Sequence, residues 1–321
     1  MSKHKQLKNN VIYIIITAVI LTIVSFLVKP AKYEAYDILA VNEELEAMEK
    51  EPENSLDVLF VGNSECADVY APVQLYGENG FTSYNAGSSG QHFADSYAIL
   101  KEELKRQKPK LIVIETNSLF VDYDLYNTKN WLEILVQRVF PITHYHSFYK
   151  LAKLPELIPS RITETKTAAS RKGYWARFKS KPYKGSTDYM NQNAVEQSIP
   201  VRNQRYLERV LELARDNQTS VMLVSSPSPK NWTKGMNLGV SDWAQQNGVY
   251  FLDLNEHLED INIDWNTDSL DQGDHINHNG SKKVNAYLGK IIQQRYTLAD
   301  HRSDKDYQSW TDLYNSTILY P

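Results

Sequence analysis

The 321-residue chain has little cysteine and no excess of basic charge. Its single cysteine, Cys66, excludes an internal disulfide, and a chain of this length needs none to build a core. Its 35 Lys and Arg against 39 Asp and Glu argue against a dedicated nucleic-acid binder. With 42% hydrophobic and 23% charged residues, the composition also excludes collagen-like, low-complexity and wholly disordered proteins.

Charge is absent from residues 11–28, which read VIYIIITAVILTIVSFLV. As a helix rising about 1.5 Å per residue, this run spans roughly 27 Å, close to the hydrocarbon thickness of a bilayer. Residues 1–10 carry three lysines, which the positive-inside rule keeps in the cytoplasm. We therefore predict a cytoplasmic tail, an uncleaved membrane anchor and an outward-facing remainder. A cleaved signal peptide fits less well, because LVKPAKYEAY offers a poor cleavage site.

No Pro/Gly linker or internal repeat divides the chain after residue 56. Acid-rich residues 29–55 predict a stalk. Short apolar runs, each ending in small or polar residues, then lie at 56–61, 81–84, 111–114, 221–224 and 249–254, with helical patterns at 94–107 and 201–216. This order predicts an α/β fold, a three-layer α/β/α sandwich around a parallel five-stranded sheet, in which function gathers at the carboxyl ends of the strands.

Residues 118–200 interrupt this pattern and are rich in Tyr, Trp and Lys. We interpret them as a mostly helical insertion between the third and fourth strands, close to the active face. Aromatic rings interleaved with cations suit contacts with carbohydrate or an anionic polymer. A subdomain that serves packing alone explains the composition equally well. Residues 296–321 are predicted to form a C-terminal tail.

Ser64 is the first candidate for chemistry, since a predicted strand runs directly into Gly62-Asn63-Ser64. This places a hydroxyl at the carboxyl end of a strand, where the N–H groups of a following helix can hold a developing oxyanion. The plain alternative is a serine that begins a helix as its N-cap.

The second candidate is DQGDHINHNG at residues 271–280, just before a predicted helix. A carboxylate close to a histidine supplies a general base and the group that orients it; a polar turn is the alternative. His275 and His278 could also ligate a metal, and His144 and His146 form an H-x-H. Because no further His/Cys cluster supports such a site, we predict neither a metal nor another cofactor.

Taken in order over about residues 56–295, these motifs resemble the SGNH (GDSL-like) hydrolase superfamily. The matching positions are the nucleophile Ser64 in VGNSE, Gly87 in YNAGSSG, Asn117 in IETNS and the catalytic His275 in DHINHNG. The resemblance implies an SGNH (flavodoxin-like) fold in which Ser64 attacks an ester carbonyl and His275 accepts its proton. It also implies an oxyanion hole formed by the backbone N–H groups of Ser64 and Gly87 with the Asn117 amide.

Two positions depart from the family pattern. Asn63 stands where the family commonly has Asp, and Gln272 stands three residues before the histidine, where the orienting acid usually lies. Asp271 is one residue further away, and Asp274 adjoins His275. We predict Asp271 as the orienting acid, because an adjacent side chain rarely points back to its neighbour's ring; Asp274 is the alternative.

The anchored layout is similar to surface proteins of the teichoic-acid D-alanylation and polysaccharide O-acetylation types. We therefore predict a membrane-anchored extracellular serine esterase or O-acyltransferase that acts through an acyl-serine on esters of a cell-surface polysaccharide or teichoic-acid-like polymer. The resemblance suggests a membrane-bound acyltransferase as partner, and nothing suggests nucleic acid. The alternative is a non-catalytic SGNH-fold module that binds a surface polymer or a membrane acyl-export partner.

Overall fold

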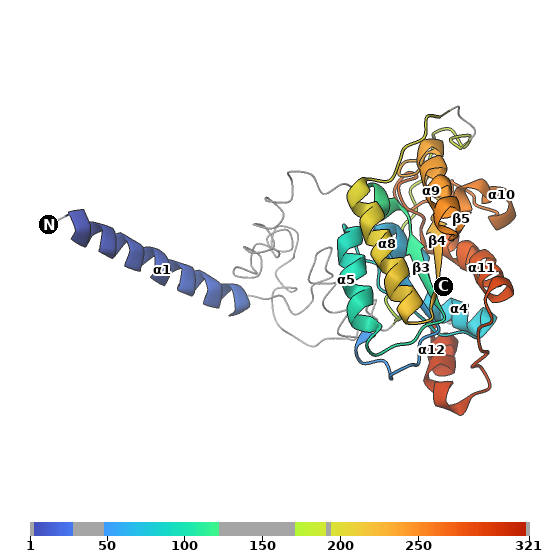
Figure 1. Cartoon of the computed structure of the whole chain (residues 1–321), viewed down its shortest axis with the longest axis horizontal. Helices are drawn as coiled ribbons and strands as arrows, with labels where there is room; N and C mark the ends of the chain where they lie inside the picture. The colour runs from blue at the N-terminus through green and yellow to red at the C-terminus, as the bar shows by residue number, and fades with distance from the viewer. Residues whose placement is uncertain (1–2, 28–47, 122–170, 191–193, 319–321) are drawn as a thin grey trace. The chain divides into compact units, whose positions relative to one another are not determined.

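The computed structural model describes residues 3–27, 48–121, 171–190 and 194–318. The chain divides into two compact units, of which one comprises Ile38–Asp122 with Lys166–Pro321. The other includes helix α1 (Lys3–Leu27) (Figure 1). Within α1, Lys8–Ser25 has a mean hydropathy of 1.7 and is long and apolar enough to cross a membrane. An anchor and a signal sequence both satisfy this test, so the helix agrees with the predicted apolar segment without separating the two.

A five-stranded parallel sheet organises the larger unit. Its strands are β1 (Val58–Val61), β2 (Ser83–Asn85), β3 (Leu111–Glu115), β4 (Ser220–Ser225) and β5 (Tyr250–Asp253). They lie in the order β2-β1-β3-β4-β5, and every neighbouring pair is parallel. All five predicted strands are confirmed. Because the strands are parallel, their carboxyl ends meet at one edge of the sheet.

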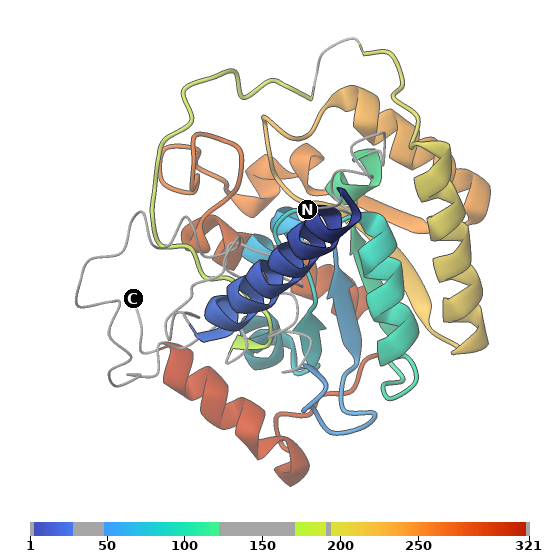
Figure 2. The same ribbon diagram turned by 90° about the vertical axis from the view of Figure 1, so that its left-hand side faces the viewer.

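Both faces of the sheet are covered, so its strands are apolar throughout rather than alternating. Leu59 and Ile112 face one core cluster, whereas Phe60 and Val113 face the other, as the two-residue period of a strand requires. Helices α5 (Phe93–Glu103), α8 (Val201–Asp216) and α9 (Lys234–Asn247) contribute to the first cluster; α4 (Pro72–Asn79) and α11 (His278–Arg295) contribute to the second. The three-layer α/β/α sandwich is therefore confirmed (Figures 1 and 2).

Two predicted helices match the structure closely. The pattern at 201–216 corresponds to α8 at the same bounds, and the pattern at 94–107 to α5, which Figure 2 shows beside α8. The shorter helices are α3 (Ser64–Val69) and α10 (Leu258–Ile261), with 3-10 turns η1 (Asn117–Phe120), η4 (Leu254–Glu256) and η5 (Lys305–Tyr307).

The C-terminal segment packs on the domain, although the sequence suggested a tail. Helix α12 (Gln308–Ile318) places Trp310 against Tyr76 of α4, with ring centroids 5.4 Å apart, and Thr311 Oγ1 lies 2.9 Å from the Tyr76 hydroxyl. The last residues of the predicted stalk belong to the domain as well, since Met48 is buried.

Part of the predicted insertion lies outside the described residues, including 122–170 with His144 and His146. The described part, 171–190 and 194–200, runs largely without helix or strand. The helical prediction for residues 122–170 therefore stays a prediction.

Candidate active site

Ser64 begins α3 immediately beyond the carboxyl end of β1. Asn63 is the N-cap, and its side-chain oxygen accepts the Glu65 N–H at 3.1 Å. Gly62 has no room for a side chain, because a Cβ there would lie 2.7 Å from Glu115 Cβ on β3. The tight strand-to-helix turn thus places the serine at the carboxyl edge of the sheet, with its side chain partly exposed.

Ser64, His275 and Asp271 form a continuous hydrogen-bonded chain. Ser64 Oγ lies 2.9 Å from His275 Nε2, and His275 Nδ1 lies 2.9 Å from Asp271 Oδ2. The other oxygen of Asp271 accepts the backbone N–H of His275 at 2.7 Å. Asp274 Oδ1 is further from His275 Nδ1, at 4.0 Å. In this structure Asp271, rather than Asp274, therefore makes the direct hydrogen bond to the ring; its role as the orienting acid stays a prediction.

A short closed loop brings Asp271 back to His275. Ser269 and Ile276 form an antiparallel bridge at the base of the loop. Inside it, Gln272 and Gly273 have φ values of 69° and 88°, the left-handed conformation that reverses a chain tightly. The loop thus turns the carboxylate four residues before the histidine onto its ring, while Gln272, three residues before the histidine, is exposed.

The charges around the histidine oppose one another. Burial lowers the pKa of His275, but Glu65, the Asp271 hydrogen bond and Asp68 outweigh it and raise the pKa to about 10. Burial raises the pKa of Asp271, yet the hydrogen bonds from His275 bring it below its ordinary value. With 18% of the His275 side chain exposed, the pair remains within reach of solvent.

The predicted oxyanion-hole donors lie around the start of α3. Ser64 N–H, in the first turn of the helix, donates no hydrogen bond within the described part of the chain. Gly87 packs against α3: a Cβ there would lie 2.6 Å from Cys66 Cβ. The Gly87 N–H donates to Asn85 Oδ1 at 2.9 Å in this structure. Its role as an oxyanion donor stays a prediction.

Asn117 lies in η1, beyond the carboxyl end of β3. Its side-chain oxygen accepts from Asn63 Nδ2 at 2.7 Å, and its Nδ2 donates to the Asn231 carbonyl at 2.8 Å. Asn63 thus both caps α3 and orients Asn117. One N–H of the Asn117 amide is occupied by Asn231, and the role of the second N–H as an oxyanion donor stays a prediction.

Three further polar residues complete the site, and the local sequence pattern did not mark them as functional. Glu65 is 1% exposed, and its Oε1 accepts from Asn231 Nδ2 at 2.8 Å; Asn231 Nδ2 also donates to Asp274 Oδ1. Glu115 is buried beside Glu65, and burial and that neighbouring carboxyl raise its pKa to about 8. The only local signal was an acid placed directly after the serine and another ending an apolar strand.

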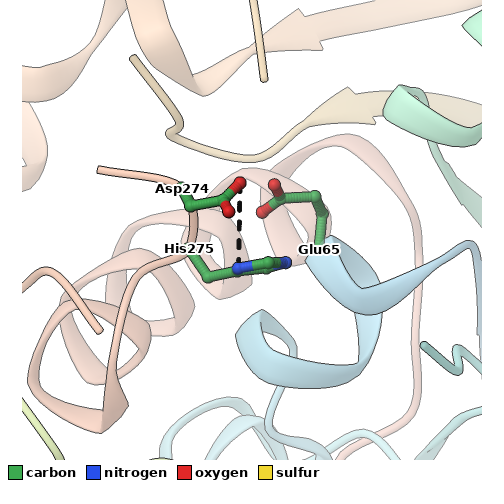
Figure 3. Close-up of side chains that lie close together, drawn as sticks. All are labelled: Glu65, Asp274 and His275. Carbon is green, nitrogen blue, oxygen red and sulfur yellow. Dashed lines mark ion pairs between the residues drawn. The ribbon is translucent and has the colours of Figure 1, made fainter. Parts of the chain in front are cut away.

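Glu65, Asp274 and His275 are the described residues that could hold a metal, since one ligand atom from each lies within 4.8 Å of the others. Figure 3 shows the two carboxylates on the same side of the imidazole, Glu65 from α3 and Asp274 from the loop before α11. Both ring nitrogens of His275 already have partners, Asp271 at Nδ1 and Ser64 at Nε2. The donor set therefore fits a proton-transfer site better than a metal site.

Residues 174–184 of the predicted insertion lie along this edge. Trp175 N–H donates to the Ala67 carbonyl at 2.9 Å, and Arg177 pairs with Asp68 at 3.0 Å. The Arg177 carbonyl accepts the His278 N–H at 2.7 Å, and the ring of Phe178 is 57% exposed. Trp175 and Arg177 therefore contact α3, the helix that begins at Ser64, and Arg177 also contacts the chain at His278. The placement of the whole insertion at the active face stays a prediction.

Comparison with known proteins gives a likeness of fold and no assignment of family. No protein-family model and no curated protein matches the chain. Among solved structures, a GDSL-like lipase from Bacteroides thetaiotaomicron VPI-5482 is 15% identical with a TM-score of 0.40, over 81% of this chain and 98% of that one. A catalytic mutant of an acetylxylan esterase from Geobacillus stearothermophilus is 16% identical with a TM-score of 0.37, over 75% and 96%. At these values the likeness assigns no activity.

Proposed function

We propose that the chain is a serine esterase or O-acyltransferase of the SGNH type. The observation that carries the proposal is the hydrogen-bonded chain from Ser64 through His275 to Asp271. A nucleophile within reach of a base, with that base oriented by a carboxylate, is the arrangement that acyl transfer requires. The order of the motifs along the sequence supports the same conclusion.

The reaction follows from these positions. Ser64 Oγ bonds to the ester carbonyl carbon while its proton passes to His275 Nε2, and Asp271 stabilises the resulting imidazolium. The carbonyl oxygen, now an oxyanion, accepts hydrogen bonds from Ser64 N–H and the Asn117 amide. The bond to the leaving alcohol then breaks, and His275 returns its proton to the alcohol oxygen. Water or an acceptor hydroxyl attacks the acyl-serine by the same steps, giving a carboxylic acid or a new ester.

We further propose that the enzyme is held at the outer face of the membrane and acts on a surface glycopolymer, with a membrane-bound acyltransferase as partner. Helix α1 supports the anchor by its length and composition. The exposed Phe178, whose ring centroid lies 5.0 Å from that of His278, and the basic residues of the same segment support a polymeric carbohydrate substrate.

A fluorophosphonate probe, which reacts with activated serines, tests the enzyme proposal. We expect the full-length protein in detergent to label at one site, and Ser64→Ala to abolish labelling without changing the circular dichroism spectrum. His275→Gln should slow labelling about 1000-fold or more, because Ser64 then lacks its base. Ser118→Ala is the control, since Ser118 is buried and takes no part in the hydrogen bonds that join Ser64, His275 and Asp271. Folded wild-type protein that does not label would favour the non-catalytic binding module.

A further inference from the structure

Glu65 carries a buried carboxyl that the acyl-transfer steps do not use. It follows the nucleophile directly, is 1% exposed, and lies within 4.8 Å of His275, measured between a carboxylate oxygen and a ring nitrogen. Asn231 Nδ2 donates to its Oε1, whereas Oε2 is buried and has no hydrogen-bond partner within the described residues. Burying a carboxyl with one unpartnered oxygen is costly, so the position calls for a compensating role.

Other acidic groups face the same imidazole. Asp271 bonds Nδ1 directly, and Asp274 lies 4.0 Å from it. Asp68, one turn along α3, also favours a charged His275, but its own charge is paired with Arg177 at 3.0 Å. Asp271 and Asp274 are partly exposed and lie at the solvent side, whereas Glu65 is enclosed. A charge on Glu65 is therefore screened least and acts most strongly on the ring.

None of the remaining titratable neighbours that the structure describes offsets the effect of the Glu65 charge on the His275 ring. Glu115 is predominantly protonated at neutral pH, because burial and Glu65 raise its pKa to about 8. Burial holds the pKa of the Tyr70 hydroxyl well above its ordinary value, so this group stays neutral. The cations pair elsewhere: Arg177 with Asp68, while Lys230 acts on Asp271. No lysine or arginine among the described residues forms an ion pair with Glu65.

We propose that Glu65 is a positioning residue for the Ser64–His275 reaction, in which its carboxylate stabilises the imidazolium form of His275. The inference rests on the proposed function. The Glu65 carboxylate then has two opposing effects on the reaction. It stabilises the positively charged ring that forms as Ser64 attacks. It also keeps a proton on the ring of the resting protein, and a protonated ring cannot accept the proton of Ser64.

The sign of the pH dependence follows from these effects. Labelling of Ser64 requires an unprotonated Nε2, so its rate rises with pH as His275 loses its proton. Burial raises the pKa of Glu65 to about 7, and Glu65, together with the hydrogen bond to Asp271 and the charge of Asp68, raises the pKa of His275 to about 10. Removing the carboxylate lowers the pKa of His275, which moves the rise to lower pH. It also removes stabilisation from the charged transition state, which lowers the plateau.

Glu65→Gln tests the proposal, because the amide keeps the oxygen that Asn231 contacts and loses the charge. The rate constant of fluorophosphonate labelling is measured from pH 6 to about 11.5 on the full-length protein in detergent, because the wild-type rise is centred near pH 10 and its plateau lies above that pH. We expect the midpoint to fall by about 1 to 2 pH units, the size of a charge interaction across this distance. The plateau should fall about tenfold. A purely structural role would lower the rate at every pH and leave the midpoint in place, which would overturn the proposal.

Two variants control this experiment. Glu103→Gln removes a second buried carboxyl that also has an unpartnered oxygen, but on α5 and outside the site. We expect it to keep the wild-type midpoint. Glu65→Asp retains the charge and should keep the midpoint within half a pH unit of the wild type. A Glu65→Asp midpoint as low as that of Glu65→Gln would contradict an electrostatic role.

A direct titration of His275 separates failure of this inference from failure of the proposed function. Ring-labelled histidine NMR, with His275→Gln to identify the resonance, reports its protonation whether or not the protein is an enzyme. We expect a wild-type midpoint above pH 8, lowered in Glu65→Gln. A midpoint of the wild-type His275 titration below pH 7 would overturn the inference. This outcome is measured on the wild-type protein alone, so it does not depend on whether a variant folds. If the folded wild-type protein labels at no pH, the proposed function is wrong. The NMR titration still decides whether Glu65 raises the pKa of His275.

Discussion

At the residue scale, His275 depends on a carboxylate in an unusual sequence position. Asp271 holds both the ring and the backbone of His275, through Nδ1 at 2.9 Å and N–H at 2.7 Å. Asp274, adjacent in sequence, receives instead a hydrogen bond from Asn231 Nδ2 and stays 4.0 Å from the ring. Asp271 therefore contacts His275 and Asp274 contacts Asn231, although the sequence alone allowed either acid to contact the histidine.

This separation predicts unequal effects of the two amide substitutions. Asp271→Asn should lower the labelling rate of Ser64 about 100-fold to 10,000-fold, because the ring loses the acceptor that fixes its tautomer. Asp274→Asn should lower it about threefold or less. The measurement is the rate constant of fluorophosphonate labelling at pH 9, with folding checked by circular dichroism. Equal losses in the two variants would make Asp274 an orienting acid as well.

Glu65, Glu115 and Asn231 show where prediction at the residue scale ends. Ser64 and His275 stand in short motifs, so their types and order along the chain marked them. Asn231 lies in an irregular loop after β4, and its contacts with Glu65 and Asn117 join segments 166 and 114 residues apart. Such contacts depend on how the strands order in the sheet, which the local pattern does not contain.

At the element scale, the helix that carries Ser64 is held by the loop after β2. Gly87 lies so close to α3 that a Cβ would approach Cys66 Cβ at 2.6 Å, its Sγ at 2.7 Å and Ala67 N at 2.9 Å. Two of these atoms belong to a buried cysteine and one to backbone, so none can move freely. The close approach fixes the distance between the helix start and the second strand.

Gly87→Ala should therefore displace α3 and separate Ser64 from His275. We expect a loss of about 1 to 3 kcal/mol of unfolding free energy, as in other overpacked sites, and a labelling rate reduced at least tenfold. Gly90→Ala is the comparison, since its Cβ would meet nothing within 4 Å and its φ of 68° alone should cost about 1 kcal/mol. Urea unfolding followed by tryptophan fluorescence measures the unfolding free energy of both variants, and fluorophosphonate labelling measures the rate. Wild-type labelling in Gly87→Ala would show that α3 is not held there.

The strands were easier to predict from the sequence than the C-terminal segment that packs on the domain. Each strand is a compact apolar run with a polar end, and both faces are buried, so the pattern is local. Residues 296–321, which include helix α12, were predicted to form a tail. The helix is attached through the tilted contact of Trp310 with Tyr76, more than 200 residues earlier in the chain. No periodicity in residues 296–321 could reveal that contact.

At the scale of the whole molecule, the apolar helix and the α/β domain belong to separate compact units. The Ser64–His275 site lies entirely within the unit formed by Ile38–Asp122 and Lys166–Pro321. The hydrogen bonds from Ser64 through His275 to Asp271 are therefore made within this unit. On the proposed function, α1 determines where the domain works rather than what it does.

Removal of residues 1–37 should release the protein from the membrane and leave it folded. In cells that make the full chain, an external protease should digest the α/β domain, because the proposed anchor would place the domain outside. In cells that make the truncated chain, the domain should be soluble and protected until the cells are lysed. Protection of the full-length domain, or membrane association of the truncated one, would contradict the proposed topology. Immunoblotting of fractions before and after lysis measures both.

The contact between Ser64 and His275 joins residues 211 positions apart, and strands β2, β3, β4 and β5 lie between them in the sequence. During synthesis, the nucleophile therefore emerges long before its base. On the proposed mechanism, the serine of the nascent chain stays inert until the last strand and the loop after it have been made. A protein shortened anywhere before residue 275 would then lack the base, and an incomplete chain could not attack esters in the compartment where it is made.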